Sequence, residues 1–248
     1  MISVKGKWAF ITGAARGIGR LTAVFMAQQG CNLVLHSRSL AHTASLLEEV
    51  RALGVQAEAV EAELSDPAQV EAMLQAIDAM GMQIDIVLNN AGLQIAYRTS
   101  YFETPVSDYT GSFMINTIAP ATICYHFMPG MIERGFGRIL NTTSGIRLEP
   151  QQAGYSASKA ALDKITIDLG STVQGTDVMI NLTDPGWCRT DLGGPHAPNA
   201  PESAIPGIVA GVFANDGKSG RFLGAQNFAG MTIEEAAAKV EAEFDSPY

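Results

Sequence analysis

The stretch Trp8-Ala9-Phe10-Ile11-Thr12-Gly13-Ala14-Ala15-Arg16-Gly17-Ile18-Gly19 joins a short apolar run to a segment that predicts a helix over 21–29. The apolar run is typical of a buried strand. Its glycines permit a tight turn and a close approach of the backbone to a bound group, and the helix N-terminus offers free N–H groups. This strand–turn–helix context predicts a dinucleotide site at Gly13, Arg16, Gly17, Ile18 and Gly19. The alternative is a turn that is needed only for close packing.

Outside this stretch, strand-like and helix-like segments alternate to the end of the chain. Strands are expected at 31–36, 55–62, 84–88, 137–142, 178–182 and 221–223, and helices at 43–53, from 65, within 104–131, at 154–173 and from 232. This alternation predicts βαβ units and therefore a doubly wound parallel sheet with helices on both faces, a three-layer αβα sandwich.

No linker or repeat divides the chain, so residues 1–248 are expected to form one domain. The proline-rich stretch 193–206 lies within an expected substrate loop of about 187–213. A long loop of this kind is either a lid over a site or a plain surface loop.

Composition excludes several classes of protein. Hydrophobic residues make up 47% of the chain and charged residues 17%, which supplies a core and argues against disorder. The net charge of −9 argues against a nucleic-acid or anionic-membrane partner. Three separated cysteines form no disulfide framework, and the four histidines show no metal-ligand spacing, so no metal is expected. With no secretory leader and no run of 18 apolar residues, a cytoplasmic protein is expected.

The end of the second expected strand indicates which dinucleotide is bound. An acidic residue there would bind a ribose 2′-hydroxyl and repel a 2′-phosphate. The chain instead has His36-Ser37-Arg38, and the Arg38 guanidinium can bind a phosphate through two N–H groups. Arg16 would face the same region. The sequence therefore predicts NADP(H) in preference to NAD(H), unless Arg38 is simply a solvated residue at the start of a helix.

Tyr155 and Lys159 stand four residues apart in a helix-prone segment, so they share one helix face. A neighbouring ammonium favours the phenolate and lowers the phenol pKa from its usual value of about 10. Such a pair could exchange a proton with a substrate near neutral pH. Taken alone, the spacing also fits two half-exposed residues on an amphipathic helix.

Taken in order, these motifs resemble the short-chain dehydrogenase/reductase family, over about residues 6–224. The matching stretches are Thr12-Gly13-x-x-x-Gly17-x-Gly19, Asn89-Asn90-Ala91-Gly92, Tyr155-x-x-x-Lys159 and Asp184-Pro185-Gly186 followed by Thr190. The resemblance implies a Rossmann fold and reversible hydride transfer between a nicotinamide and a carbonyl or alcohol carbon. The tail, from Pro185 to Pro195 and beyond, resembles that of carbonyl reductases.

The resemblance also implies roles for individual residues. Tyr155 would transfer the proton, Ser144 would hydrogen-bond the developing oxyanion, and Lys159 would lower the Tyr155 pKa and hold the nicotinamide ribose. Asn116 falls at the family's catalytic Asn and would anchor a water that relays protons through Lys159. The implied catalytic residues are Asn116, Ser144, Tyr155 and Lys159. Besides the glycine turn, the expected cofactor residues are Ser37, Arg38, Glu63, Leu64, Asn90, Ala91, Gly92, Tyr155, Lys159, Pro185, Gly186 and Thr190.

Two features depart from the family pattern. Glu63 stands where the family usually has an Asp against the adenine ring, and the loop between Ser144 and Tyr155 is slightly short. No large insertion precedes Tyr155, so the family's dimer or tetramer is expected, packed through helices around 104–131 and 155–173.

The expected substrate is a small or medium ketone or aldehyde with a polar substituent. The candidate pocket residues are Gln94, Ile95, Tyr97, Ile146, Arg147, Gln151, Gln152, Trp187 and Cys188. The leading function is NADPH-dependent carbonyl reduction or its reverse. The alternatives are a sugar or polyol dehydrogenase that uses the same residues and a non-catalytic NADP-sensing protein.

Overall fold

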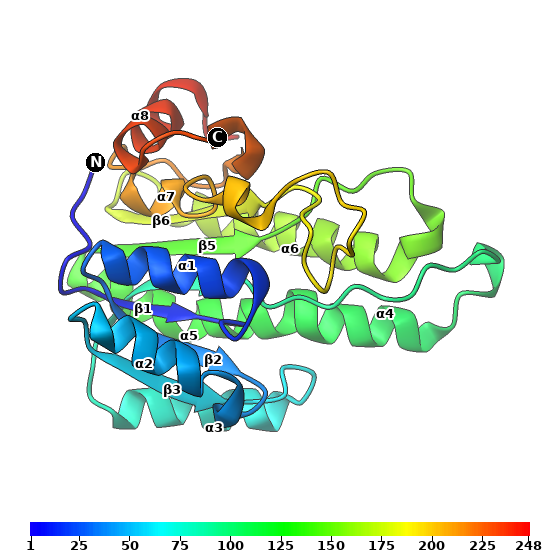
Figure 1. Cartoon of the computed structure of the whole chain (residues 1–248). Helices are drawn as coiled ribbons and strands as arrows, with labels where there is room; N and C mark the ends of the chain where they lie inside the picture. Colours follow the sequence, from blue (N-terminus) through cyan, green and yellow to red (C-terminus); the bar gives the residue numbers. More distant parts are fainter.

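The computed structural model describes all of residues 1–248 and is built on one parallel sheet of seven strands (Figure 1). The strands are β1 (Trp8–Ile11), β2 (Asn32–Ser37), β3 (Ala57–Glu61), β4 (Ile84–Asn89), β5 (Gly137–Thr142), β6 (Val178–Asp184) and β7 (Phe222–Gly224). They lie in the order β3-β2-β1-β4-β5-β6-β7. Each neighbouring pair is parallel, as the alternation of elements predicts.

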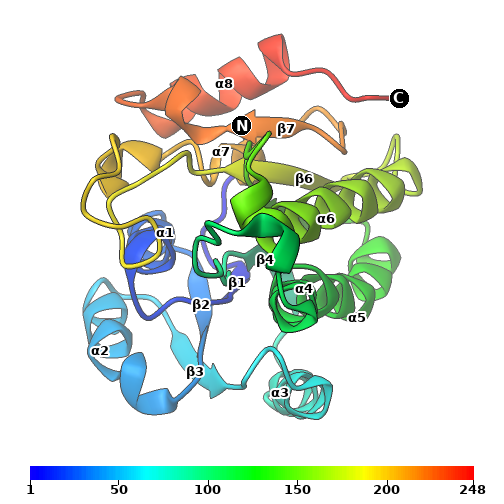
Figure 2. The same cartoon turned by 90° about the vertical axis from the view of Figure 1, so that its right-hand side faces the viewer.

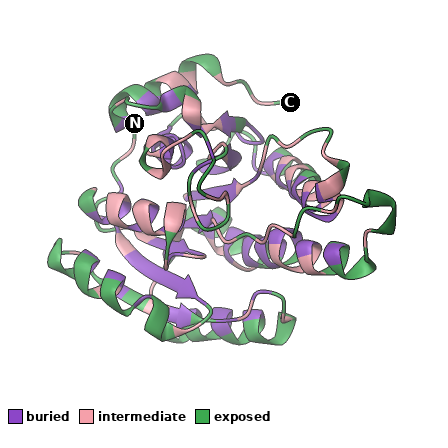
Figure 3. Cartoon of the chain, turned by 45° about the vertical axis from the view of Figure 1, so that its right-hand side comes forward, coloured by how far each residue is buried: buried purple, intermediate pink, exposed green.

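The central strands are buried on both faces because apolar residues occupy both sides of each strand. In β1, Ala9 and Ile11 belong to one core cluster, whereas Phe10 belongs to the other. In β2, Leu33 and Val34 divide between the two clusters in the same way. This uninterrupted apolar pattern is what a sheet between two helical layers requires. Figure 3 shows the buried strands at the centre and the exposed residues on the outer sides of the helices.

Helices cover both faces of the sheet (Figures 1 and 2). On one face α1 (Gly17–Gln28), α2 (Ala44–Ala52) and the short α7 (Ala210–Phe213) pack against the sheet, and α8 (Ile233–Glu243) packs on α7. On the other face lie α3 (Pro67–Ala79), α5 (Ala119–Arg134) and α6 (Ala153–Ser171), with α4 (Val106–Phe113) beside α6. The chain therefore forms the expected three-layer αβα sandwich.

The sequence of strands creates a crevice between β1 and β4. From β1 the chain runs outward through β2 and β3, then returns to place β4 on the other side of β1. The loops after β1 and β4 therefore leave the sheet in opposite directions, and ligands of open α/β sheets bind in such a crevice. The glycine turn follows β1, and Asn90 follows β4, so both segments border this crevice.

Several element boundaries differ from the expected ones. The expected helix within 104–131 is two helices joined by a π-helical turn, Met114–Ile118, which carries Asn116. The expected last strand 221–223 lies one residue later, and α7 was not expected, because four residues carry too little periodicity to indicate a helix. None of the helices is long and apolar enough to cross a membrane.

Candidate active site

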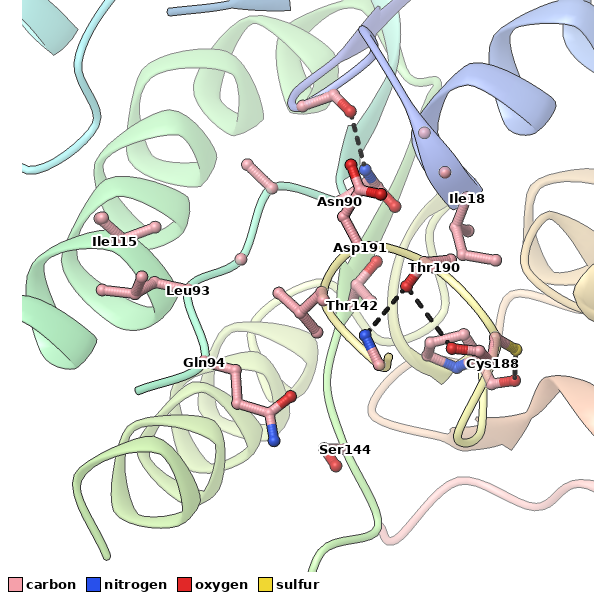
Figure 4. A pocket seen from close by; sticks show the side chains of 18 of the residues that line it. Ile18, Asn90, Leu93, Gln94, Ile115, Thr142, Ser144, Cys188, Thr190 and Asp191 are labelled. Atoms are coloured by element: carbon pink, nitrogen blue, oxygen red, sulfur yellow. Dashed lines mark hydrogen bonds between the residues drawn. The ribbon is translucent and has the colours of Figure 1, made fainter. Parts of the chain in front are cut away.

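A cleft of about 1550 Å³ lies at the carboxyl ends of the strands. The loops after β1 to β6, together with α6, supply its walls (Figure 4). The cleft is lined by every residue that the sequence analysis assigned to the cofactor: Gly13, Arg16, Gly17, Ile18, Gly19, Ser37, Arg38, Glu63, Leu64, Asn90, Ala91, Gly92, Tyr155, Lys159, Pro185, Gly186 and Thr190. Ser144 lines it as well, whereas Asn116 is buried behind the wall.

The glycine turn is shaped by close contacts that exclude other side chains. Gly13 has a φ of +65°, and a Cβ there would lie 2.9 Å from the Ala91 Cα. A Cβ on Gly19 would lie 2.2 Å from the Gly13 carbonyl oxygen. Asn90 holds the turn in place, since its Nδ2 donates to the Thr12 carbonyl at 3.1 Å and to the Gly13 carbonyl at 3.3 Å.

The N-terminus of α1 fits the pyrophosphate of a dinucleotide. Arg16, at the N-cap, makes no side-chain capping hydrogen bond, and the first N–H groups of a helix have no partner within it. The residues that carry these groups, Gly17, Ile18 and Gly19, all line the cleft. Uncapped N–H groups and the positive end of the helix dipole are suited to bind an anion.

The ribose end of the cleft carries two exposed cations, Arg16 and Arg38. Arg38 has no ion-pair partner within the chain, but Arg16 Nη1 lies 2.8 Å from Asp191 Oδ2. Asp191 lies 175 residues away along the chain and is not among the residues predicted for the site. Beneath Arg38, burial lowers the pKa of His36. The neutral ring accepts from the Gly13 N–H through Nδ1 at 3.3 Å and donates to the Ala62 carbonyl through Nε2 at 3.1 Å.

Ser144, Tyr155 and Lys159 meet at one part of the cleft wall. The Ser144 Oγ accepts a hydrogen bond from the Ile146 N–H at 3.2 Å, which leaves its proton free to be donated. Lys159 Nζ donates to the Thr142 carbonyl at 2.7 Å and lies 5.9 Å from the centre of the Tyr155 ring. Tyr155 is 8% exposed and Lys159 is 3% exposed, so both are largely shielded from water.

The electrostatics of this pair differ from the expectation. Burial raises the pKa of Tyr155, the Ser144 hydroxyl acts to lower it, and the Asp184 carboxylate raises it further. Burial lowers the pKa of Lys159 to about 8, against the opposing effects of Asp163 and Asp184. The expected lowering of the Tyr155 pKa is not found here, because burial of the phenol is the largest cause and raises the pKa.

Asn116 lies on the π-helical turn and is fully buried. Its Oδ1 accepts from the Leu93 N–H at 2.8 Å, and its Nδ2 donates to the Leu93 carbonyl at 2.8 Å and to Ser158 Oγ at 3.0 Å. These bonds connect the loop after β4 to α6. Because both amide donors are used, the side chain acts here by holding this loop in position.

The substrate end is formed by two loops that are hydrogen-bonded to each other. Tyr97 pairs with Glu149, the Arg98 N–H donates to the Gln151 carbonyl at 3.0 Å, and Gln152 Nε2 donates to the Ile95 carbonyl at 3.0 Å. Seven expected pocket residues line the cleft: Gln94, Ile95, Tyr97, Ile146, Gln152, Trp187 and Cys188. Arg147 lines a separate pocket of about 300 Å³ instead, and Gln151 lines neither.

Sequence reasoning missed several residues of the site. Asp184 was noted only as part of a motif, although both of its oxygens accept hydrogen bonds from backbone N–H groups. Thr12 was noted in the same way, yet its Oγ1 accepts from the N–H groups of Asn90 and Ala91, each at 3.0 Å. The contacts of Asp184 with Gly145 and of Thr12 with Asn90 and Ala91 join residues far apart along the chain, so only the fold reveals them.

Comparisons with known proteins agree with this geometry. A very-long-chain 3-oxoacyl-CoA reductase of Phaeosphaeria nodorum is 31% identical over 232 residues, which cover 91% of this chain and 67% of the relative. An NADPH-dependent aldehyde reductase-like chloroplastic protein of Arabidopsis thaliana is 31% identical, covering 77% of this chain and 76% of that protein.

Solved structures give the same picture. A metagenomic short-chain oxidoreductase in complex with NADP superimposes with a TM-score of 0.69 at 28% identity, covering 75% of this chain and 84% of that chain. A 3-oxoacyl-[acyl-carrier protein] reductase from Brucella melitensis with bound NAD gives a TM-score of 0.75 at 25% identity, covering 90% of each chain. The short chain dehydrogenase family model matches residues 7–200. The chain therefore belongs to the short-chain dehydrogenase/reductase family of oxidoreductases.

Proposed function

We propose that the protein interconverts a ketone or aldehyde and the corresponding alcohol, with NADP(H) as the hydride carrier. The observation that carries this proposal is the meeting of Ser144, Tyr155 and Lys159 in the cleft that also contains the uncapped N-terminus of α1. A protein that only senses a dinucleotide would need the helix terminus but not a buried phenol with a hydroxyl donor beside it. The nicotinamide supplies the hydride when it is bound.

In the reduction direction, Tyr155 donates its phenolic proton to the carbonyl oxygen as that oxygen gains negative charge. The raised pKa of Tyr155 keeps the phenol protonated and therefore ready to donate. Ser144 donates a hydrogen bond to the same oxygen, a contact that typically contributes about 3 kcal/mol when charge develops on the acceptor. Lys159, held by the Thr142 carbonyl, is placed to bind the ribose hydroxyls of the nicotinamide half.

NADP(H) is preferred over NAD(H) in this proposal because of Arg16 and Arg38. Both guanidinium groups line the ribose end of the cleft, and β2 ends in Ser37 where an acidic residue would repel a 2′-phosphate. Similar proteins are described with NADPH, NADP or NAD, so the family alone does not determine the choice.

For the substrate we propose a ketone or aldehyde of small or medium size with a polar substituent. Ile95, Ile146 and Trp187 supply apolar surface at the substrate end, while the Gln94 amide can bind a polar group. Figure 4 shows Gln94 and Ser144 in the same part of the cleft. Arg147 lies outside this cleft, which argues against its use as a carboxylate anchor.

The test is the oxidation of NADPH in the presence of a panel of ketones, aldehydes, keto sugars and 3-oxoacyl thioesters, followed by absorbance. Turnover with ketones or aldehydes supports the proposal, and a clear preference for keto sugars would favour the sugar or polyol alternative. Tyr155→Phe should retain the fold and NADPH binding but lose nearly all turnover. Tight NADPH binding without turnover of any carbonyl would point to a sensor instead.

We also propose that the chain forms a homodimer or homotetramer through α4, α5 and α6. Ile118 at the end of the π-helical turn and Tyr125 and Ile132 on α5 repeat at seven-residue intervals and are 44%, 60% and 48% exposed. Such an apolar stripe on one helix face is typical of a surface that packs against a second copy. Light scattering should give a mass of two or four chains, and Tyr125→Asp should lower it. A monomeric wild-type protein would contradict the proposal.

A further inference from the structure

Asp184, the last residue of β6, connects two loops of the cleft. Its Oδ2 accepts a hydrogen bond from the Gly145 N–H at 2.9 Å, and its Oδ1 accepts one from the Gly186 N–H at 2.9 Å. Gly145 directly follows Ser144, whereas Gly186 lies in the loop after β6 that continues to Thr190. One carboxylate therefore sets the spacing between the serine loop and the loop after β6.

The pair of hydrogen bonds by which Asp184 joins the two loops requires a carboxylate side chain of this length. A carboxylate has two acceptor oxygens, but an amide of the same shape has only one and would turn an N–H group toward a backbone N–H group. The fit is also close, since a Cβ on Gly145 would lie 3.0 Å from Asp184 Oδ2. The longer side chain of glutamate would have to displace one of the two loops in order to keep both bonds.

The same carboxylate acts electrostatically on the groups that handle the proton. Burial is the largest cause of the raised pKa of Tyr155, and the charge of Asp184 adds to it. For Lys159 burial lowers the pKa, while Asp163 and Asp184 oppose this effect. The groups that face the pair are thus Asp163 on α6, Asp184 at the end of β6 and the Ser144 hydroxyl at the end of β5.

We propose that Asp184 is a positioning residue of the active site, which fixes the serine loop against the loop after β6 by accepting one backbone hydrogen bond from each. This inference rests on the proposed carbonyl reduction. Asp184 itself donates no proton to the substrate. It acts through Ser144 and Tyr155.

Two variants separate the effect of the Asp184 charge from the effect of its side-chain length: Asp184→Asn and Asp184→Glu. In the holoenzyme, kcat and KM are measured against pH with NADPH and the best carbonyl of the panel, together with NADPH affinity and thermal unfolding. Reduction needs the protonated phenol, and loss of the negative charge lowers the Tyr155 pKa. For Asp184→Asn we expect the alkaline limb of the kcat–pH profile to move to lower pH by about 0.5–1 unit. We also expect kcat to be about tenfold lower.

Asp184→Glu retains the charge, so its alkaline limb should stay at the wild-type pH while its kcat falls, because the loop spacing has changed. Asp78→Asn, which alters an exposed acid on α3, is the control and should change neither quantity. If Asp184→Asn does not fold, Asp184→Glu decides alone: a lower kcat at an unshifted limb supports the proposal, and wild-type kinetics overturns it.

If the wild type is active but Asp184→Asn changes neither kcat nor the alkaline limb of the kcat–pH profile, the inference is overturned. The proposed function then remains intact. A wild type that reduces no carbonyl overturns the proposed function and this inference with it. A stability loss in Asp184→Asn with unchanged kinetics would show a purely structural role and would also overturn the inference.

Discussion

Arg16 on the glycine turn and Asp191 on the loop after β6 form an ion pair across the mouth of the cleft, with Arg16 Nη1 2.8 Å from Asp191 Oδ2. Their side chains are 69% and 70% exposed, so the pair lies in water. Arg16 is also one of the two cleft-lining cations that we propose bind the 2′-phosphate of NADP(H). A 2′-phosphate and the Asp191 carboxylate would therefore compete for one guanidinium.

Replacement of this acid should strengthen NADPH binding. Exposed ion pairs typically contribute about 0.2–1 kcal/mol, so we expect Asp191→Asn to lower the Kd of NADPH by a factor of about 1.4 to 5. The Kd of NADH should not change, because NADH has no 2′-phosphate. Fluorescence titrations with both dinucleotides check this, with Asp168→Asn on α6 as the control. An equal change for NADPH and NADH would contradict the competition.

Removal of Arg38 should reverse the cofactor preference. Arg38→Ala deletes a cation that has no acidic partner within the chain, so kcat/KM with NADPH should fall by about tenfold or more while that with NADH changes little. Arg20→Ala is a matched control, since Arg20 pairs with Glu49 on the outer surface. An unchanged ratio of kcat/KM for NADPH and NADH would refute the assignment of Arg38 to the 2′-phosphate.

Much of the fold was predictable because its signals are local. The glycine turn between an apolar strand and a helix and the apolar pattern of β4 each lie within a few residues. The start of α3 is equally local, since Asp66 caps the helix by accepting from the Ala68 N–H at 3.0 Å. That the expected cofactor residues line one cleft was also predictable, because the carboxyl ends of parallel strands meet at one edge of the sheet.

The rest of the site depends on contacts between distant segments. Arg16 pairs with Asp191, and Lys159 is held by Thr142, but nothing in the spacing of these residues indicates their geometry. The expected effect of Lys159 on the Tyr155 pKa was wrong for this structure because a local charge argument omits burial, which is the largest cause acting on both groups. The loop contacts that place Arg147 outside the cleft were equally inaccessible from the sequence.

Asn116 should be important for stability as well as for activity. Asn116→Ala would leave the half-buried Leu93 N–H and carbonyl without their partners, at a cost of up to about 1–3 kcal/mol for each unpaired group. For a chain of this size each kcal/mol lowers Tm by about 2–4 °C. Thermal unfolding measures the loss, and Asn215→Ala, at an exposed site, should have almost no effect. A Tm equal to that of the wild type would argue against the loop-holding role.

Lys159 is expected to contribute to activity at the expense of stability. Its pKa is lowered from 10.5 to about 8 by burial, so the unfolded chain binds more protons than the folded chain between these values. Stability then rises with pH across this window, and the penalty is fully present below pH 8. A shift of this size corresponds to about 3 kcal/mol.

Lys159→Met, which fills a similar volume without charge, should therefore be more stable than the wild type at pH 7, although it loses turnover. The difference in unfolding free energy between the two proteins should shrink as the pH rises from 8 toward 10.5, because the folded wild-type lysine loses its proton and no longer buries a charge. Urea unfolding at several pH values measures this difference, and the comparison with Lys159→Met removes the contribution of the other groups that titrate in the same range. A wild type that is more stable than Lys159→Met at pH 7 would mean that the hydrogen bond from Lys159 to the Thr142 carbonyl outweighs the cost of burying its charge.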